Sequence, residues 1–379
     1  MLILNTNNSK QGASVLEEWS SQRLGVSFIY HTDRRIYIQP VMSSFAWRRP
    51  LVRGLVGVGA GGLVGLVGAT SYTVKKINYQ RSRYWSDSFT MTPEAMRMPF
   101  RSVSFRTEDG ITLSGWYVPQ THRGKPSKRI IVCCNPYNHD RSTMLGVARG
   151  LWEASYSVLL FNFRSHAKLQ TQQSIGHLEV SDARAALEWV RKNKEPSARI
   201  GVLGASMGGA MALTMAEEND DLVACATDCA FTSLYDVISH RVELEISFLF
   251  QGRPWLKKQF MRLVSFSNLF LYGYDLRQVG PGKNLGKISC PLLVVHSEND
   301  SIVPVSCAYD IYENCSTKEA EKEIVILKNV EHIGSYFQDE YGYVKRFVRF
   351  FDQTFDQSQE ACSPPPFSTL ARETDLAKN

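Results

Sequence analysis

The sequence is 379 residues long and 44% of it is hydrophobic, so the chain can bury a large core and is neither disordered nor fibrous. Its net charge of +6 comes from the first 90 residues, which hold eleven Lys or Arg against four Asp or Glu. The remainder is nearly neutral, which argues against a basic nucleic-acid-binding surface. The eight cysteines show no spacing typical of zinc ligands. We therefore expect buried free thiols, no metal and no cofactor.

Residues 1–53 show neither clear periodicity nor the layout of a signal peptide, and we expect this segment to be poorly ordered. Met42 begins "MSSFAWRRPLVRG", which resembles the start of a membrane anchor. Translation from Met1 and translation from Met42 both remain open.

Three glycines of the next segment, Gly57, Gly59 and Gly62, have the G-x-G-x-x-G spacing of a dinucleotide-binding turn. That motif needs a preceding strand and an acidic residue about 20 positions later. Here arginines precede the glycines, and the first acidic residue after them is Asp87. The residues around these glycines therefore argue against a nucleotide site.

Residues 54–74 are better explained as a transmembrane helix. These 21 uncharged residues lie between Arg53 and Lys75, and eight of them are Leu or Val. About 20 apolar residues span a bilayer, where the backbone must form a helix despite its glycines. We expect a single-pass membrane protein with a linker at 75–99. Basic residues flank both ends, so the side on which the catalytic domain lies stays open.

Small residues recur at four-residue spacing along this run, at Gly57, Gly61, Gly65 and Ala69. This pattern is typical of closely packed transmembrane helix pairs, although so many glycines also produce it by chance. Self-association through this face is one expectation, and an unpaired helix is the alternative.

From residue 100 the pattern becomes that of an α/β fold. Residues 103–119 alternate around Asp109-Gly110 as in a hairpin, and helical patterns cover 180–193 and 207–218. Short apolar runs typical of buried parallel strands lie at 129–134, 156–163, 199–204, 222–227, 291–296 and 323–328. We expect a domain at 100–356 with a mostly parallel sheet flanked by helices, a helical cap insertion at about 232–288, and a disordered tail at 357–379.

The stretch "RIGVLGASMGGAMAL" places Ser206 between Gly204 and Gly208, after a strand and before a helix. This is the context of a nucleophile elbow, in which the small flanking residues let strand and helix pass closely. A serine nucleophile needs a histidine base and a carboxylate that orients it. Asp300 follows the apolar run at 291–296, and His332 follows the run at 323–328. The chain order is therefore Ser, acid, His, and we predict this triad.

Other residues could fill two of these roles. Glu298 and Asp228 are the alternative acids, and Asp300 is preferred because it lies beside the turn "NDSIVP". The alternative bases are His139, His166 and His296. The first two precede Ser206 in the chain, and His296 is better explained as a strand-end residue near the site.

An oxyanion hole needs backbone N–H groups aimed at the developing charge. Met207 follows the nucleophile at the helix N-terminus and supplies one. The loop "NPYNHDRST" after residue 134 should supply the other. Since Pro136 has no N–H, we predict Tyr137 as the second donor.

Residues 100–355 resemble the α/β-hydrolase superfamily. The features are "GASMGG", "HSENDSIVP", "VEHIG", and "FNFRSHA" followed by "IGHLEVSDARAALEWV". The chain is similar to membrane-anchored serine hydrolases such as depalmitoylating thioesterases, and to prolyl-oligopeptidase-like domains. It departs from them at Asn135-Pro136, where relatives commonly carry His-Gly.

Together these features predict a membrane-anchored serine hydrolase that cleaves esters or thioesters through an acyl-enzyme. A peptidase of the same fold and a non-catalytic binding protein are the alternatives. The insertion at 248–274 is dense in Phe, Leu, Tyr and Trp. It can accept an acyl chain or enter the membrane interface, or it can simply pack the cap onto the sheet. The expected partners are a lipid bilayer and an acyl substrate, with no nucleic acid.

Overall fold

The centre of the protein is an eight-stranded sheet with the strand order β12-β11-β10-β9-β7-β8-β4-β3. The computed structural model describes residues 28–32, 35–39, 60–78, 91–122, 124–166, 174–194, 197–250 and 252–362. The strands are β3 (Arg101–Arg106), β4 (Thr112–Val118), β7 (Arg129–Cys134), β8 (Ser157–Phe161), β9 (Arg199–Ala205), β10 (Ala224–Asp228), β11 (Leu292–Ser297) and β12 (Lys322–Leu327). From β8 to β12 neighbouring strands of the sheet are parallel, and β4 is the antiparallel strand, because it pairs antiparallel with both β8 and β3. The expected mostly parallel sheet is confirmed.

Alternate residues of the inner strands face two separate cores. In β7, Ile130 and Val132 face one core, whereas Ile131 and Cys133 face the other. Both faces are thus buried, which explains why these strands are continuous apolar runs in the sequence.

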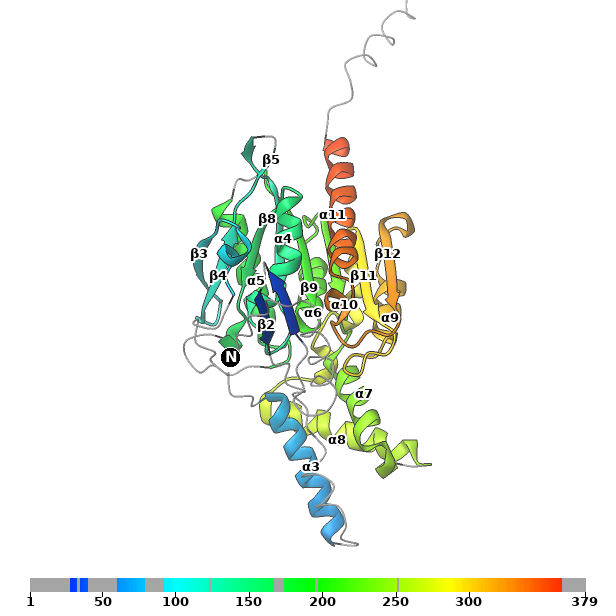
Figure 1. Ribbon diagram of the computed structural model, residues 1–379. Coiled ribbons are helices and arrows are strands. Elements are labelled where there is room, and N and C mark those ends of the chain that lie inside the picture. The colour runs from blue at the N-terminus through cyan, green and yellow to red at the C-terminus, as the bar shows by residue number, and fades with distance from the viewer. Residues whose placement is uncertain are drawn as a thin grey trace, which may run out of the picture.

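Helices cover both faces of the sheet (Figure 1). The first core contains residues of α5 (Glu179–Asn193), α6 (Met207–Glu218) and α9 (Ser306–Asn314). The second contains residues of α4 (Leu145–Glu153) and α11 (Glu340–Cys362), including Phe347, Phe351 and Phe355. The helix α11 continues to Cys362, into the segment predicted as a disordered tail.

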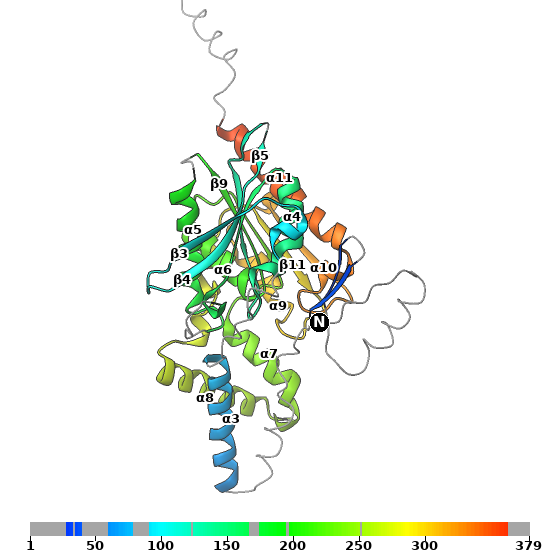
Figure 2. The same cartoon turned by 60° about the vertical axis from the view of Figure 1, so that its left-hand side comes forward.

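The segment between β10 and β11 forms a helical cap. It contains α7 (Leu234–Ile246), η5 (Ser247–Phe250), α8 (Pro254–Tyr272), η6 (Leu276–Gln278) and η7 (Gly282–Lys287). The two long helices project from one end of the sheet, beside α3 (Ala60–Asn78) (Figure 2). Phe260, Met261 and Val264 of α8 share the first core with Val74 and Ile77 of α3. The cap and the N-terminal helix therefore pack as one unit.

The N-terminal helix differs from the predicted segment in its limits. It begins at Ala60 and continues to Asn78, past residue 74, while residues 54–59 lie outside the described part of the chain. Of the small-residue face, Gly57 lies outside it too, and Ala69 is buried within the chain's own core. Among the described helices, none combines the length and apolar character needed to cross a membrane.

One short hairpin lies within the segment predicted to be poorly ordered. Strands β1 (Phe28–Thr32) and β2 (Arg35–Gln39) pair antiparallel. Hydrophobic periodicity over so few residues is too weak to predict a hairpin.

Candidate active site

Ser206 stands at the sharp turn between β9 and α6. Its backbone has φ 54° and ψ −120°, which lies in the left-handed region that non-glycine residues rarely adopt. A Cβ on Gly204 would lie 2.0 Å from the carbonyl oxygen of Gly208, and a Cβ on Gly208 would lie 2.1 Å from that of Cys134. No side chain fits at either distance, so both glycines are required for this turn.

Ser206, His332 and Asp300 form a continuous hydrogen-bonded relay. His332 Nε2 lies 2.8 Å from Ser206 Oγ, and His332 Nδ1 lies 2.6 Å from Asp300 Oδ2. The three residues come from the loops that follow β9, β12 and β11. Because the carboxyl ends of parallel strands meet at one edge of the sheet, residues distant in sequence converge there.

Asp300 is held in its ionised form. Burial by itself raises the pKa of this carboxyl, but the charge and hydrogen bond of His332, together with the Val303 N–H, outweigh it and lower the pKa. Oδ1 accepts the backbone N–H groups of Ile302 and Val303, each at 2.8 Å. These bonds fix the carboxylate so that Oδ2 faces His332 Nδ1.

The two predicted oxyanion donors come from the start of α6 and from the loop after β7. Met207 begins α6 immediately after Ser206, and Tyr137 lies in the loop after β7. Within the described residues, neither backbone N–H donates a hydrogen bond to another protein group. The loop lies against the elbow, since the carbonyls of Cys134 and Asn135 are the nearest atoms to Gly208. Both N–H groups thus remain available to an oxyanion.

The loop that carries His332 is held by hydrogen bonds on both sides of the histidine. Ser297 Oγ donates to the carbonyl of Glu331 at 3.1 Å, and Ile333 N–H donates to Cys229 Sγ at 3.5 Å. Ile333 has φ 52°, an unusual value for a β-branched residue. The roles of Ser297 and Cys229 have no signal in the sequence, because they arise from contacts between strand ends far apart in the chain.

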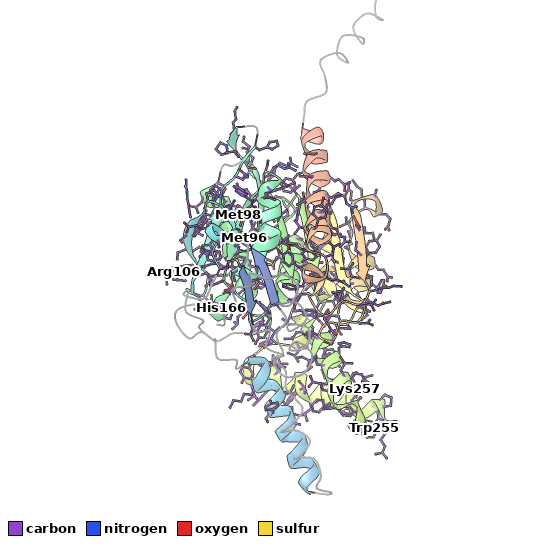
Figure 3. The ribbon with its side chains drawn as sticks, in the orientation of Figure 1. Met96, Met98, Arg106, His166, Trp255 and Lys257 are labelled. Atoms are coloured by element: carbon purple, nitrogen blue, oxygen red, sulfur yellow. The ribbon has the colours of Figure 1, made fainter. Side chains whose placement is uncertain are left out.

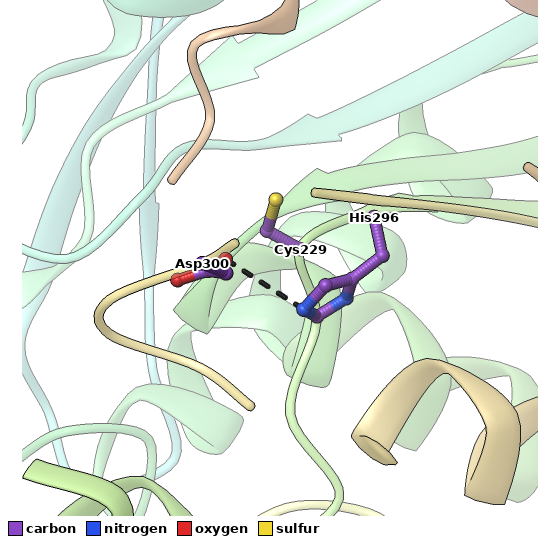
Figure 4. A group of neighbouring side chains, drawn as sticks. All are labelled: Cys229, His296 and Asp300. Carbon is purple, nitrogen blue, oxygen red and sulfur yellow. Dashed lines mark ion pairs between the residues drawn. The ribbon is translucent and has the colours of Figure 1, made fainter. Parts of the chain in front are cut away.

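Cys229 and His296 lie next to the triad acid Asp300 (Figure 4), and the ligand-type atoms of the three residues lie within 4.8 Å of one another. All three already have other bonds: His296 Nε2 lies 3.2 Å from Val303 O, and the Asp300 oxygens accept the bonds given above. Burial raises the pKa of Cys229 well above its usual value, which disfavours the thiolate that a metal needs. The set fits support of the triad acid better than metal binding.

The dashed contact in Figure 4 joins His296 Nε2 to Asp300 Oδ2 at 3.6 Å. Burial lowers the pKa of His296, so its imidazole is neutral near pH 7. His296 lies close to the site at a strand end, as expected, but the histidine that Asp300 orients is His332.

The remaining alternatives lie outside the relay. Asp228 ends β10, where its Oδ2 accepts the hydroxyl of Tyr343 at 2.9 Å, and burial raises its pKa. Glu298 is exposed. His139 is close enough for the charge of His332 to act on it, and burial lowers its pKa to about 4. Burial also lowers the pKa of His166.

The motifs "FNFRSHA" and "VSDARAALEWV" meet through a buried ion pair. Arg164 donates to both oxygens of Asp182 in the first turn of α5, with NH2 2.8 Å from Oδ1. Arg164 also reaches Asp109 of the β3–β4 turn at 2.7 Å. The pair joins the hairpin, the end of β8 and α5, so these residues shape the fold beside the site.

The part of the chain that carries the triad matches a known protein family. The sequence pattern of the prolyl oligopeptidase family matches residues 162–358, about half of the chain, and this span includes Ser206, Asp300 and His332. The chain belongs to the prolyl oligopeptidase family.

Two bacterial relatives of this prolyl oligopeptidase family chain have names that state no activity. The uncharacterized protein Rv2307c of Mycobacterium tuberculosis is 28% identical over 256 residues, which are 67% of this chain and 80% of the relative. The uncharacterized protein YqkD of Bacillus subtilis is 27% identical over 213 residues, which are 55% of this chain and 66% of YqkD. The chain therefore spans just under two thirds of YqkD.

Among solved structures, the esterase Pf2001 of Pyrococcus furiosus is similar to this prolyl oligopeptidase family chain with a TM-score of 0.55. The two are 22% identical, and the match covers 73% of this chain and 98% of the esterase. This likeness concerns the fold. Together with the parallel sheet and its flanking helices, it shows an α/β-hydrolase fold.

Proposed function

We propose that the protein is a serine hydrolase that cleaves carboxylic esters or thioesters through an acyl-enzyme on Ser206. The observation that carries this proposal is the relay from Ser206 Oγ through His332 to Asp300, with distances of 2.8 Å and 2.6 Å. Both distances lie within the range needed for proton transfer between a nucleophile, its base and the group that orients the base.

Acylation begins when Ser206 Oγ attacks the carbonyl carbon of the substrate while His332 Nε2 accepts the hydroxyl proton. Asp300 stabilises the resulting imidazolium through the bond to Nδ1–H. The N–H groups of Met207 and Tyr137 then stabilise the oxyanion of the tetrahedral intermediate. Its collapse breaks the bond to the alcohol or thiol, which takes the proton from His332.

Deacylation repeats these steps with water as the nucleophile. His332 accepts a proton from water, the hydroxide attacks the acyl carbon, and collapse returns the proton to Ser206 Oγ as the carboxylic acid leaves. The chain's own residues supply every proton transfer.

The choice of an acyl substrate is supported by the cap. Its helices α7 and α8 are rich in aliphatic and aromatic residues, which suit an apolar acyl group better than a peptide. Membership of the prolyl oligopeptidase family favours the second candidate, a serine peptidase with the same triad.

A matched substrate series separates these candidates. We expect hydrolysis rates of p-nitrophenyl esters and acyl thioesters to depend on acyl chain length and to exceed those of proline-containing peptide anilides. Ser206→Ala should lower the ester rate by about 10⁴-fold or more. Faster anilide cleavage would favour the peptidase. If the folded wild-type protein hydrolyses none of these substrates, the non-catalytic alternative would be supported.

We also propose that residues 54–74 hold the protein at a membrane. Support comes from the uncharged sequence between Arg53 and Lys75. The protein should remain in the membrane fraction after alkaline carbonate extraction, and replacing residues 54–59 by a Ser/Asn linker should release it. Self-association through the small-residue face is a further proposal, and cross-linking before and after Gly61→Leu tests it.

A further inference from the structure

The cap helix α8 has apolar residues on two opposite faces. Its inner face buries Phe260, Met261, Val264, Ser265 and Asn268. Its outer face, called the cap face below, comprises Trp255, Arg262, Phe266, Leu269 and Phe270. These five recur at helical spacing along one side, and the four apolar ones are 59%, 66%, 48% and 79% exposed in that order.

An exposed stripe of this composition is not needed for packing the cap. The inner face already meets the core, so the large side chains of the cap face contribute nothing to that burial. Phe266 and Phe270 stack on each other with ring centroids 6.4 Å apart, one turn apart on the helix. Adjacent exposed aromatic residues of this kind mark interaction surfaces.

The charge of α8 indicates the chemistry of its partner. The helix contains Lys257, Lys258 and Arg262 and has no acidic residue. Lys257 pairs with Glu243 of α7 at 2.7 Å, whereas Lys258 lies exposed beside the cap face. Apolar and aromatic residues together with cations on an exposed helix face are the combination that binds an anionic lipid surface.

The position of α8 indicates the same partner. The helices α3, α7 and α8 project together at one end of the molecule, and Trp255 lies at the tip of the cap (Figure 3). A groove of about 470 Å³ between α3 and the end of α8 is lined by Ser71, Val74, Lys75, Leu271 and Tyr272. It is flanked by exposed Lys75 and Leu271, so its borders have the same apolar and cationic character.

We propose that the cap face lies on the surface of a bilayer that contains anionic phospholipid. Trp255, Phe266, Leu269 and Phe270 enter the interface, and Lys258 and Arg262 contact lipid phosphate. This docking places the cap, whose helix α7 contacts the backbone of Asp300 through His240, against the lipid. It depends neither on hydrolysis nor on the proposed membrane span at 54–74.

Trp255 provides a direct test in the full-length chain, because brominated acyl chains quench only tryptophans that reach the interface. The chain is added to vesicles of brominated phosphatidylcholine with phosphatidylserine, and its quenching is compared with that of Trp255→Phe. The phenylalanine keeps the face apolar and removes the reporter, so the difference isolates Trp255. We expect clear quenching of Trp255 that falls by roughly half or more in the double variant Phe266→Ser, Phe270→Ser.

Two further variants sharpen the result. The double variant Lys258→Glu, Arg262→Glu should reduce the quenching on vesicles with phosphatidylserine and change it little on phosphatidylcholine alone. Tyr341→Ser is the matched control, since Tyr341 is an aromatic residue on α11, 75% exposed and outside the cap, and this change should have no effect.

Equal quenching of wild type and Trp255→Phe would overturn the proposal and would favour a protein partner for the cap face. An equal loss of Trp255 quenching in Tyr341→Ser would also overturn the proposal. The thermal unfolding of each variant is measured as well, because an unchanged unfolding midpoint shows that a loss of quenching does not come from unfolding. A failure of the docking proposal would leave the assignment of Ser206 untouched.

Discussion

The backbone of Ser206 adopts a conformation that costs on the order of 1–3 kcal/mol for a residue with a side chain. The surrounding turn maintains it, because Ser206 N–H donates to the carbonyl of Asp228 at 2.8 Å and the flanking glycines leave no other path for strand and helix. This backbone conformation directs Oγ at His332 Nε2 and not along the helix.

The role of Asp300 as the acid of the triad can be tested by removing its charge. Asp300→Asn should lower kcat on the order of 10⁴-fold with little change in KM, because an amide nitrogen facing His332 Nδ1 would favour the wrong tautomer. Steady-state ester kinetics measure this loss. Glu298→Gln is the matched control and should keep full activity. A larger loss in the control than in Asp300→Asn would move the acid to Glu298.

The bond from Ser297 gives a second prediction. Ser297→Ala removes the hydroxyl that donates to the carbonyl of Glu331, so the His332 loop loses one of the hydrogen bonds that hold it. A lost hydrogen bond of this kind is worth about 1 kcal/mol, so kcat should fall roughly fivefold while KM stays unchanged. A rise in KM without loss of kcat would instead place Ser297 in substrate binding.

Sequence patterns predicted the residues that now form the relay because each follows a recognisable strand. Ser206 lies in a motif, and Asp300 and His332 come after apolar runs in the required order. Ser297 and Cys229 could not be predicted in this way. Each acts on a loop far along the chain, and no local spacing encodes such contacts.

The link between α3 and the cap is a buried polar network. Asn78 Nδ2 donates to Asn268 Oδ1 at 2.6 Å, Tyr274 Oη donates to Asn78 Oδ1 at 2.6 Å, and Asn268 Nδ2 donates to the carbonyl of Tyr274 at 2.8 Å. The Tyr274 ring stacks on His177, with centroids 4.1 Å apart. The network therefore connects the N-terminal helix with the cap and with the loop before α5.

Removing one hydroxyl from this network tests its role. Tyr274→Phe leaves Asn78 Oδ1 buried without its donor, which should cost about 1–3 kcal/mol of unfolding free energy. Hydrogen exchange should rise in α3 and α8 before it rises in the sheet. Tyr272→Phe is the control, because no described residue accepts or donates a hydrogen bond to its hydroxyl. Equal exchange in both variants would contradict the network's role.

The sheet strands were predictable as elements because a strand buried on both faces is apolar at every position. The packing of α3 on α8 was not predictable, because the run at 54–74 shows no amphipathic pattern that distinguishes protein from lipid as its neighbour. The polar residue that decides the contact, Asn78, lies beyond that run in the segment predicted to be a linker.

Across the whole molecule, stability should depend on a buried acid in the first core. Glu179 accepts bonds from Ser174 N–H, Ser174 Oγ and Gly176 N–H. Burial, assisted by the charge of Asp182, raises the pKa of Glu179 from 4.5 to about 7. The folded chain therefore keeps this proton across a pH range in which the unfolded chain releases it.

This difference fixes the sign of a pH effect. As pH rises from about 4.5 to 7, the unfolded state binds fewer protons than the folded state at Glu179, so stability falls. Glu179→Gln cannot titrate. Its stability deficit relative to wild type should therefore shrink over this window, as measured by urea unfolding at several pH values. A deficit that grows with pH would mean that Glu179 is ionised in the folded protein.

The activation of Ser206 by His332 and Asp300 can be measured by mass analysis of the intact chain after reaction with a fluorophosphonate. We expect one phosphonyl adduct, located on Ser206 by peptide mapping, absent in Ser206→Ala and formed far more slowly in His332→Ala. No adduct on the folded wild-type chain, or equal labelling of Ser206→Ala, would contradict the role of Ser206 as the activated nucleophile.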